Sequence, residues 1–265
     1  MYSVSHFFLA HATAVQTSLF AFILTTTWLF EWAFQPQLAN LKWRHTALNS
    51  LFIVSALPIQ IGMMLLCVCV SRWTTQHHWG LIYLLPNAEQ PLIKYGLMFV
   101  ALDFLDYVYH VTMHHVGVLW RFHLVHHTDQ AVDVSTTVRE HPGETFIRNC
   151  FLILWVFLCG ASLEVLILRQ TTETISNLLS HSALRLPPKF AQFMGWLLIT
   201  PNLHHVHHHY VLPATNRNYG DVFSVWDRLF GTFANLPPEA TVFGCLLYTS
   251  PSPRDRTRSR MPSSA

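Results

Sequence analysis

Histidine is the residue type through which this sequence is best equipped to do chemistry. The chain has 18 histidines against 16 Lys and Arg and 14 Asp and Glu, and 13 of the histidines fall between His110 and His209. Three clusters with the spacings HxxxH, HxxHH and HxxHH are formed by His110 and His114, by His123, His126 and His127, and by His204, His207 and His208. Residues three or four apart share one face of a helix, so each cluster directs its imidazoles toward one point.

These clusters predict two metal ions. Eight imidazoles exceed the four ligands of one tetrahedral ion, and all-nitrogen ligation suits iron, zinc or copper better than magnesium or calcium. The five cysteines show no CxxC spacing, so thiolate ligands are not expected. Neighbouring His115, His205 and His209 lie on the wrong helical face and are predicted to be bystanders. Five isolated histidines are predicted to lie at the membrane interface: His6, His11, His45, His77 and His78.

The composition is typical of a membrane protein. Of the 265 residues, 51% are hydrophobic and 11% are charged, and the mean hydropathy is +0.30. Soluble proteins carry about a quarter charged residues, so the deficit argues against a cytosolic enzyme, a nucleic-acid binder and a disordered protein. The sequence therefore predicts an all-α integral membrane protein with about four to five transmembrane helices and a cytoplasmic, histidine-rich helical cap.

Four segments are predicted to span the membrane: 13–34, 51–70, 91–110 and 150–168. The second is an uncharged 20-residue stretch, long enough to cross ~30 Å of hydrocarbon as a helix. In the last segment, Gly160 and Glu164 favour either a bent span or a hairpin that turns within the membrane. Lys42 and Arg44 indicate that the loop between the first two spans is cytoplasmic. If the spans alternate in direction, the region after His110 is cytoplasmic too.

One membrane-embedded domain is predicted over residues 1–244, with a cap made of residues 110–148 and 181–233. Residues 245–265, CLLYTSPSPRDRTRSRMPSSA, change abruptly to Arg, Ser and Pro and resemble a translated transposase-type sequencing adapter. We expect this segment to be foreign to the protein; a basic juxtamembrane tail is the alternative. Without its four Arg and one Asp, the net charge falls from +2 to −1.

The histidine clusters and the blocks around them resemble the fatty acid hydroxylase superfamily, the membrane group that includes sterol desaturases, methyl-sterol oxidases and carotenoid hydroxylases. The similar blocks are, in order, DFLDYVYHVTMHH, LWRFHLVHH, TTVREHPGE, HSALRLP, TPNLHHVHH and NYGDVFSVWDRLFGTF. The resemblance extends over about residues 42–233 and is specific from Asp103 onward. It implies a pair of irons that activates O₂ to attack an unactivated C–H bond of a lipid.

The resemblance also implies a ligand set, which consists of the eight clustered histidines and His181 of HSALRLP. Relatives that act on fatty acyl chains carry a further HxxxH here, whereas this sequence has Asn177 before His181, so one imidazole is missing. His141 in REHPGE is a candidate replacement, which makes ten predicted metal ligands. A hydrogen-bonded histidine of the cap is the alternative role for His141.

Acidic residues one or two turns before the first cluster are candidates to support it. Asp103, Tyr107 and His110 fall at i, i+4 and i+7, and Asp106 lies one turn before His110. A buried carboxylate there would accept the second ring N–H of a ligand and fix its tautomer. Solvation of the helix end is the alternative role for Asp103 and Asp106.

Charged residues elsewhere in the predicted cap are expected to be structural. Arg121, Arg139 and Glu144 are predicted to pair and hold its helices together.

The leading interpretation is an O₂-dependent membrane hydroxylase or desaturase acting on a sterol, fatty acyl, sphingoid or carotenoid lipid. The chain lacks a CxxCH haem motif, a Rossmann glycine pattern and an iron–sulfur cysteine set, so electrons are expected from a separate ferredoxin or cytochrome b5-like protein. A zinc-dependent membrane hydrolase is an alternative, although the HExxH general base is absent. A metal transporter or bis-histidine haem carrier is another, but haem would leave most clusters unexplained.

Overall fold

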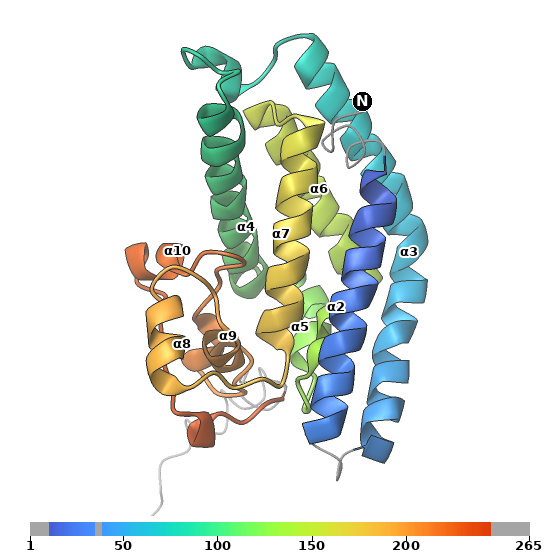
Figure 1. Ribbon diagram of the computed structural model, residues 1–265, viewed down its shortest axis with the longest axis vertical. Coiled ribbons are helices and arrows are strands. Elements are labelled where there is room, and N and C mark those ends of the chain that lie inside the picture. Colours follow the sequence, from blue (N-terminus) through green and yellow to red (C-terminus); the bar gives the residue numbers. More distant parts are fainter. Residues whose placement is uncertain (1–10, 35–38, 245–265) are drawn as a thin grey trace, which may run out of the picture.

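The computed structural model describes residues 11–34 and 39–244, and this part of the chain is built from helices (Figure 1). The long helices form a bundle and are α2 (Ala12–Phe34), α3 (Ala39–Gln76), α4 (Met98–His115), α6 (Pro142–Cys159) and α7 (Leu163–His181). Helix α2 packs on α7, α3 packs on α6, and α4 packs on both α6 and α7. The predicted foreign segment 245–265 lies outside the described residues, as does His6.

The cap gathers at one end of the bundle, where α4 and α7 end and α6 begins (Figure 1). Its helices are α5 (Gly117–His127), α8 (Pro188–Met194), α9 (Pro201–His207) and α10 (Val225–Leu229), with short turns η4 (Val134–Val138), η5 (Ala214–Asn216) and η6 (Pro238–Ala240). Turn η2 (Leu81–Leu84) and the π-helical turn η3 (Leu92–Leu97) lie between α3 and α4 in the chain. The described residues include two isolated β-bridges and no sheet, which agrees with the predicted all-α fold.

Three helical segments are long and apolar enough to cross a membrane, and they are Ala14–Phe34, Leu41–Leu84 and Pro142–Cys159. The predicted span 13–34 coincides with the first of these segments, and the predicted span 51–70 lies within the second. The surfaces of these helices support a lipid environment, because Phe22 and Val54 point outward with 68% and 69% exposure while Asn49 is fully buried. Apolar side chains outside and polar side chains inside are the arrangement that hydrocarbon requires.

The predicted span 91–110 is a helix that runs further than expected. The turn η3 continues directly into α4, which extends to His115. This helix contains Lys94, Asp103 and Asp106 and is not among the three sufficiently apolar segments of the described chain. Four to five spans were predicted, and three segments of the described chain are long and apolar enough to be spans. That α4 also crosses the membrane stays a prediction.

The predicted segment 150–168 is a hairpin, one of the two forms expected for it. Helix α6 ends at Cys159, Gly160 adopts a left-handed conformation with φ of 76°, and α7 begins at Leu163. Glycine is required at this turn because a side chain on Gly160 would collide with the backbone carbonyl of Trp79. The turn brings α7 back through the bundle, so that its last residue, His181, reaches the cap.

Candidate metal centre

Four helices carry imidazoles to the junction between bundle and cap. The residues are His110 and His114 on α4, His123, His126 and His127 on α5, His181 at the end of α7, His204 and His207 on α9, and His208 as the residue that follows α9. Helix α9 has only seven residues, but its start is well defined. Thr200 precedes Pro201, and its hydroxyl accepts the Leu203 N–H.

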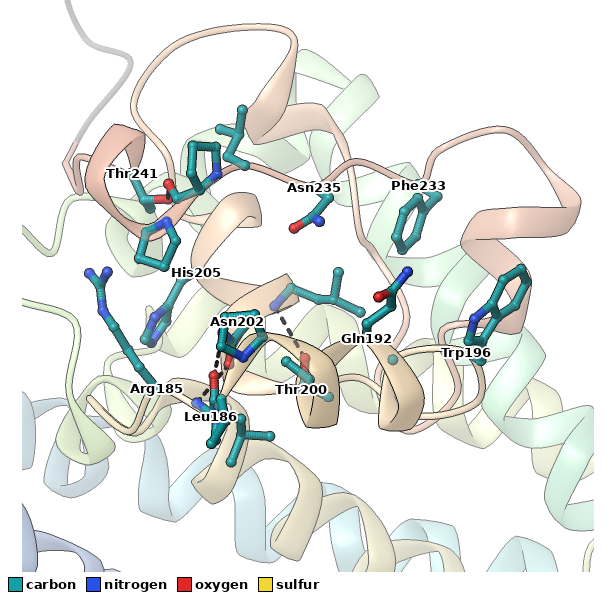
Figure 2. Close-up of a pocket in the computed structure, with 18 of the residues that line it drawn as sticks. Arg185, Leu186, Gln192, Trp196, Thr200, Asn202, His205, Phe233, Asn235 and Thr241 are labelled. Atoms are coloured by element: carbon teal, nitrogen blue, oxygen red, sulfur yellow. Dashed lines mark hydrogen bonds between the residues drawn. The ribbon is translucent and has the colours of Figure 1, made fainter.

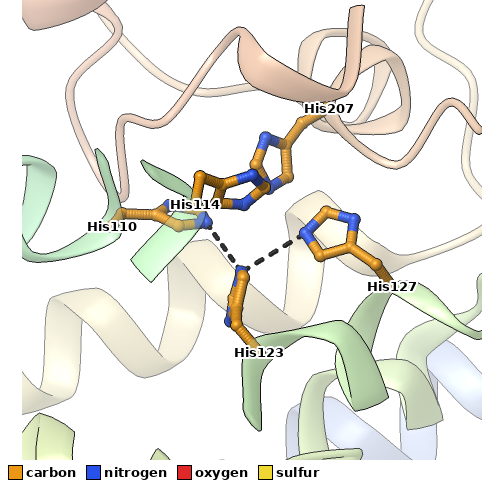
Figure 3. Close-up of side chains that lie close together, drawn as sticks. All are labelled: His110, His114, His123, His127 and His207. Atoms are coloured by element: carbon orange, nitrogen blue, oxygen red, sulfur yellow. Dashed lines mark hydrogen bonds between the residues drawn. The ribbon is translucent and has the colours of Figure 1, made fainter. Parts of the chain in front are cut away.

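The nine imidazoles form two groups. The first consists of His110, His114, His123, His127 and His207 (Figure 3), and the second of His126, His181, His204 and His208. Within each group the possible ligand atoms all lie within 4.8 Å of one another. The groups adjoin, since the ring centroids of His127 and His208 are 4.7 Å apart.

Each HxxHH cluster serves both groups. On α5, the i and i+4 residues His123 and His127 enter the first group, whereas His126 at i+3 enters the second. On α9 the order is reversed, because His204 and His208 enter the second group and His207 enters the first. One turn of helix therefore contributes ligand candidates to two neighbouring positions, which explains why this spacing occurs twice.

The outward ring nitrogens of several imidazoles face backbone carbonyls. Nδ1 of His110 lies 2.9 Å from the Tyr219 oxygen, and Nδ1 of His126 lies 3.3 Å from the Arg139 oxygen. Nδ1 of His181 lies 2.8 Å from the Asn177 oxygen, and Nδ1 of His207 lies 2.8 Å from the Arg217 oxygen. A carbonyl oxygen only accepts hydrogen bonds, so Nδ1 carries the hydrogen in these four residues.

In a neutral imidazole with the hydrogen on Nδ1, the inward nitrogen, Nε2, carries no hydrogen and has a free lone pair. His126 and His181 then face each other with Nε2 lone pairs 2.9 Å apart, and two lone pairs cannot form a hydrogen bond. A metal ion with bonds of about 2.0–2.1 Å would separate neighbouring nitrogens by about 2.9–3.3 Å, from octahedral to tetrahedral geometry. The observed spacing therefore fits a metal ion in the second group, and the 3.2 Å between Nε2 of His110 and Nε2 of His123 fits one in the first.

Burial keeps these imidazoles neutral and able to ligate. Desolvation lowers the pKa of His123 to about 4, and desolvation together with repulsion from neighbouring imidazoles lowers the pKa of His126 to about 3. Neutral imidazole is the form that binds metal.

A carboxylate supports one ring of the first group. Nδ1 of His123 lies 2.5 Å from Oε1 of Glu144, which is 4% exposed in the first turn of α6. A carboxylate that accepts the second ring N–H orients a ligand and raises its basicity. The sequence analysis predicted that Glu144 pairs with arginines. The signal that was missed is Pro142, which favours the first turn of a helix and so places Glu144 at the start of α6.

The turn η5 and the loop that follows it support the first group from the other side. The loop supplies the carbonyls of Arg217 and Tyr219, and Asn216, the last residue of η5, places its side-chain oxygen 3.2 Å from Nδ1 of His114. The loop is itself fixed by Asp227, which accepts the Tyr219 N–H at 2.8 Å. Sequence reasoning missed these groups, and the available signal was the NYGDVF block.

The sequence profile of the fatty acid hydroxylase family matches residues 95–232, just over half of the chain. The chain belongs to this family. All nine grouped imidazoles lie inside the matched region.

Relatives with curated names are similar to the same part of the chain. An ornithine lipid hydroxylase, OlsE of Rhizobium tropici, is 34% identical over 171 residues, which are 63% of this chain and 48% of the relative. The alkylglycerol monooxygenase of Homo sapiens is 30% identical over 55% of this chain and 32% of its own length. The fatty acid hydroxylase vlmA of a Lecanicillium species is 27% identical over 68% and 53%, respectively. The chain thus spans about a third to a half of these relatives, and no solved structure matches it.

The three residues expected to support the ligands have other partners in this family member. Asp103 accepts the Val222 N–H at 3.1 Å and the Trp226 indole N–H at 2.7 Å. Asp106 pairs with Arg169 at 2.6 Å, and the Tyr107 hydroxyl lies 3.0 Å from that of Thr232. The expectation that Asp103 or Asp106 holds a ligand ring is therefore corrected: helical spacing put them near His110, but their side chains join α4 to α7 and to the segment 222–232.

His141, the predicted replacement ligand, lies outside both groups. It is the residue before α6, and its Nδ1 accepts the Gly143 N–H at 2.9 Å. Its ring packs 5.1 Å from that of Phe122. These contacts are those of a helix-capping histidine, and we leave His141 out of the proposed ligand set.

Arg139 holds the cap together, but not through Glu144 as predicted. Its guanidinium donates to the Val125 carbonyl at 2.9 Å, to Asn49 at 3.0 Å and to the Thr128 hydroxyl at 2.8 Å, whereas Arg121 is exposed. The predicted bystanders His115, His205 and His209 lie outside both groups. Among them, His205 is buried and hydrogen-bonds to the Ser182 carbonyl at 3.0 Å.

A second buried polar cluster, which sequence reasoning missed, lies where α2 and α3 meet η4. Lys42 donates to Glu31 at 2.6 Å and to Asp133 at 2.9 Å, and His45 lies 2.8 Å from Asp129. We call these five residues the Lys42 network. His45 is therefore not a simple interfacial residue, as had been expected of it. Glu31 also accepts the N–H of Ala183, two residues after His181, at 2.6 Å.

A cavity of about 280 Å³ adjoins the two histidine groups. It is lined by residues of α2, α4, α6 and α7 and by five of the grouped histidines, which are His110, His123, His126, His181 and His204. A larger cavity of about 840 Å³ lies in the cap between α8, α9 and residues 233–241 (Figure 2). His205 lines this larger cavity, but none of the nine grouped histidines does. The smaller cavity is therefore the one placed for chemistry at the metal centre.

Proposed function

We propose that the chain uses O₂ to hydroxylate a C–H bond of a membrane lipid at a centre of two iron ions. The observation that carries the proposal is the pair of adjoining groups in which imidazole Nε2 atoms face each other 2.9–3.3 Å apart. Family membership and relatives named hydroxylase and monooxygenase support oxygen insertion rather than desaturation or hydrolysis.

The residues divide between the two ions by group. His110, His114, His123, His127 and His207 would hold one ion, and His126, His181, His204 and His208 the other. Two irons held by neutral imidazoles would supply the capacity to activate O₂ and abstract hydrogen from an unactivated carbon.

The protein's own contribution is to fix the ligands and shape the site. Carbonyls of Tyr219, Arg217 and Asn177 hold ring N–H groups outward, so the inward nitrogens stay unprotonated. Glu144 holds the His123 N–H and raises the basicity of that ligand. The cavity beside the groups positions the substrate between α2, α4, α6 and α7.

The partners and setting follow from the same proposal. Electrons come from a separate ferredoxin or cytochrome b5-like protein, and the site faces the cytoplasm. The relatives are named for an ornithine lipid, alkylglycerols and a fatty acid, which supports a lipid substrate for this chain.

The test is metal analysis combined with isotope labelling. The full chain is produced in iron-sufficient cells with a redox partner, its metal content is measured, and host lipids are analysed after growth under ¹⁸O₂. We expect about two irons per chain and one ¹⁸O atom in a new lipid product, absent from cells carrying His110→Ala. Two zinc ions with a product formed without O₂ would instead identify a hydrolase. Haem, or metal without any lipid product, would overturn an enzymatic role.

A further inference from the structure

The cap carries a concentrated apolar surface on α8 and α10. Nine large hydrophobic residues of the described segment 182–244 are exposed, and six of them lie in two short stretches. We call these six the α8–α10 surface: Phe190, Phe193, Trp196, Leu197, Leu229 and Phe230. Each of the six is at least 50% exposed. An apolar patch of this kind on a folded domain marks a surface that binds something.

Helical spacing puts the first four of these side chains on one side of α8 and of the turn after it. Phe190 and Phe193 are three residues apart, and the coil continues beyond the helix. The Trp196 N–H donates to the Phe193 carbonyl at 3.3 Å, and the Leu197 N–H donates to the Met194 carbonyl at 3.1 Å. Lys189, beside the apolar side, is exposed. Aromatic side chains with a lysine at their edge are typical of helices that lie in a membrane interface.

Contacts with α10 fix the two stretches as one surface. The Gly195 carbonyl accepts the Ser224 hydroxyl and Nη2 of Arg228, both at 2.8 Å. The guanidinium carbon of Arg228 lies 4.2 Å from the centroid of the Trp196 ring, which is a cation–π contact. The surface is therefore preformed and does not need a partner in order to assemble.

The residues in and around α10 pack along α4 within the predicted span 91–110. Phe230 lies against Phe104, with 5.7 Å between the ring centroids. One turn nearer the start of α4, Phe223 lies against Phe99 at 5.8 Å. Figure 1 shows α10 beside α4. A segment that packs on the side of a membrane span lies at the same depth in the bilayer as the residues that it contacts.

The α8–α10 surface is continuous with an apolar side of α4. Leu97 and Val100 are 49% and 38% exposed, and they precede Phe104 by seven and four residues. This spacing puts the three side chains on one face of the helix, and Phe104 contacts Phe230. The apolar side chains that face outward from the predicted span thus lead directly to those of the cap.

The polar groups of α10 are arranged as hydrocarbon requires. Asp227 is fully buried and accepts the N–H groups of Tyr219 at 2.8 Å and Gly220 at 2.9 Å. Leu229 and Phe230 face outward, with 66% and 57% exposure. Polar groups inside and apolar groups outside are the arrangement of protein segments in contact with lipid.

We propose that the α8–α10 surface is embedded in the bilayer leaflet on the cap side, beside α4, as an element that enters the membrane without spanning it. Sequence analysis placed residues 181–233 in a cytoplasmic cap, whereas this proposal puts part of that cap in lipid. The observations that carry it are the six exposed apolar side chains and their packing against the predicted span. It goes beyond the proposed function and does not depend on the reaction at the histidine groups.

The test identifies what lies against the surface. The photocrosslinking amino acid p-benzoylphenylalanine replaces Phe193 in one variant of the full chain and Leu229 in another. Each variant is reconstituted in dioleoylphosphatidylcholine vesicles and irradiated, and its peptides are analysed by mass spectrometry. We expect a phosphatidylcholine adduct at both positions, joined through the acyl chain, because the benzophenone inserts into C–H bonds of the molecule that it touches.

Two matched positions serve as controls. Phe22, 68% exposed on α2 within the predicted span 13–34, should give a lipid adduct. Val242 is 53% exposed and apolar but lies outside the α8–α10 surface, two residues after η6. In Figure 1 the segment that contains η6 lies toward the opposite end of the cap from α10. The probe at Val242 should give no lipid adduct.

The outcomes decide the proposal without reference to metal content or lipid product. Absence of lipid adducts at Phe193 and Leu229, with an adduct at Phe22, overturns it. So does a crosslink from Phe193 to a second copy of the chain, which would assign the surface to a dimer. An adduct at Val242 as abundant as that at Phe193 also overturns it. If the Phe193 variant does not elute from size-exclusion chromatography as the wild type does, the probe is placed at Phe190.

Discussion

The two buried polar clusters of this protein are satisfied in opposite ways. In the Lys42 network, a cation lies between the carboxylates of Glu31 and Asp133, and His45 approaches Asp129. In the histidine groups, nine rings of one chemical type face one another, and the Nε2 atoms of His114 and His207 have no hydrogen-bond partner among the described residues. The first cluster is complete within the chain, whereas the second requires something from outside it.

The comparison separates a scaffold from a site among buried polar residues. Ion pairs that satisfy one another hold helices in register, and here they join α2 and α3 to η4 and to Ala183. Lone pairs that face one another have no structural use and persist only where a bound cation compensates for them. Substitutions in the two clusters should therefore damage different properties of the protein, stability in one and metal binding in the other.

The largest effect is expected from His181→Ala. This change removes one of four nitrogens from the second group, so that group should lose its metal while the bundle stays folded. We expect iron content to fall by half or more and lipid hydroxylation to drop below detection, measured by metal analysis and product assay. His115→Ala, an exposed histidine outside both groups, should change neither. Full iron content in His181→Ala would contradict the ligand assignment.

Lys42→Met should give the largest loss of stability. It leaves Glu31 and Asp133, which are 3% and 7% exposed, buried together without a cation. Removing one partner of a buried ion pair costs about 3–5 kcal/mol in the free energy of unfolding. The measurement is denaturant unfolding in detergent, with iron per folded chain determined in parallel.

The matched control for the Lys42 network is Lys94→Met. Lys94 pairs with Glu89, whose side chain is 72% exposed, so its loss should cost less than about 1 kcal/mol. Equal losses from the two variants would show that the Lys42 network does not stabilise the fold as proposed. If folded Lys42→Met protein lost iron, the Lys42 network would contribute to metal binding as well as to stability.

Glu144→Gln should weaken metal binding without unfolding the protein. The amide accepts the His123 N–H less strongly than the carboxylate does, and loss of such support typically costs about 10–100-fold in metal affinity. Iron retention against a graded chelator measures the effect. Asp103→Asn is the comparison, because Asp103 binds Val222 and Trp226; it should lower stability and leave iron affinity unchanged. The reverse pattern would return Asp103 to the role that helical spacing suggested.

The smallest effect is expected from His141→Ala. The variant loses the cap of α6, which costs about 1 kcal/mol, and keeps both irons. Unfolding and metal analysis on one preparation test both statements. Loss of an iron would instead make His141 a ligand in place of the imidazole missing at Asn177.

The spacing of the histidines was enough to predict which residues form the candidate metal centre. All eight clustered histidines and His181 lie in the two groups, because helical spacing puts each cluster on one side of its helix. Residues four apart share a group, whereas the i+3 residues His126 and His207 enter the other group, which spacing alone did not predict. The turn after Cys159 was likewise foreseeable as one of two options, since a glycine within an apolar run permits a left-handed turn. Helix ends were less predictable, as α4 shows by continuing to His115.

Contacts between residues far apart in the sequence could not be predicted from helical spacing. Asp103 and Asp106 stand one or two turns from His110, yet their partners lie at Trp226 and Arg169, 123 and 63 positions away. The carboxylate that does support a ligand, Glu144, comes from another helix, 21 positions from His123. A side chain near a ligand in sequence can point elsewhere, and the helical period alone does not say what it meets.

The sequence by itself determined that this is a helical, lipid-facing chain with histidines enough for two metal ions, because hydrophobic composition and the helical period are local properties. Only the tertiary structure decided which imidazoles share an ion, that His141 caps α6, and that Lys42 lies between Glu31 and Asp133. These depend on contacts such as that of Lys42 with Asp133, 91 positions away, or of Glu31 with Ala183, 152 positions away. Their energies come from burial and from matched charges, which exist once the helices have packed.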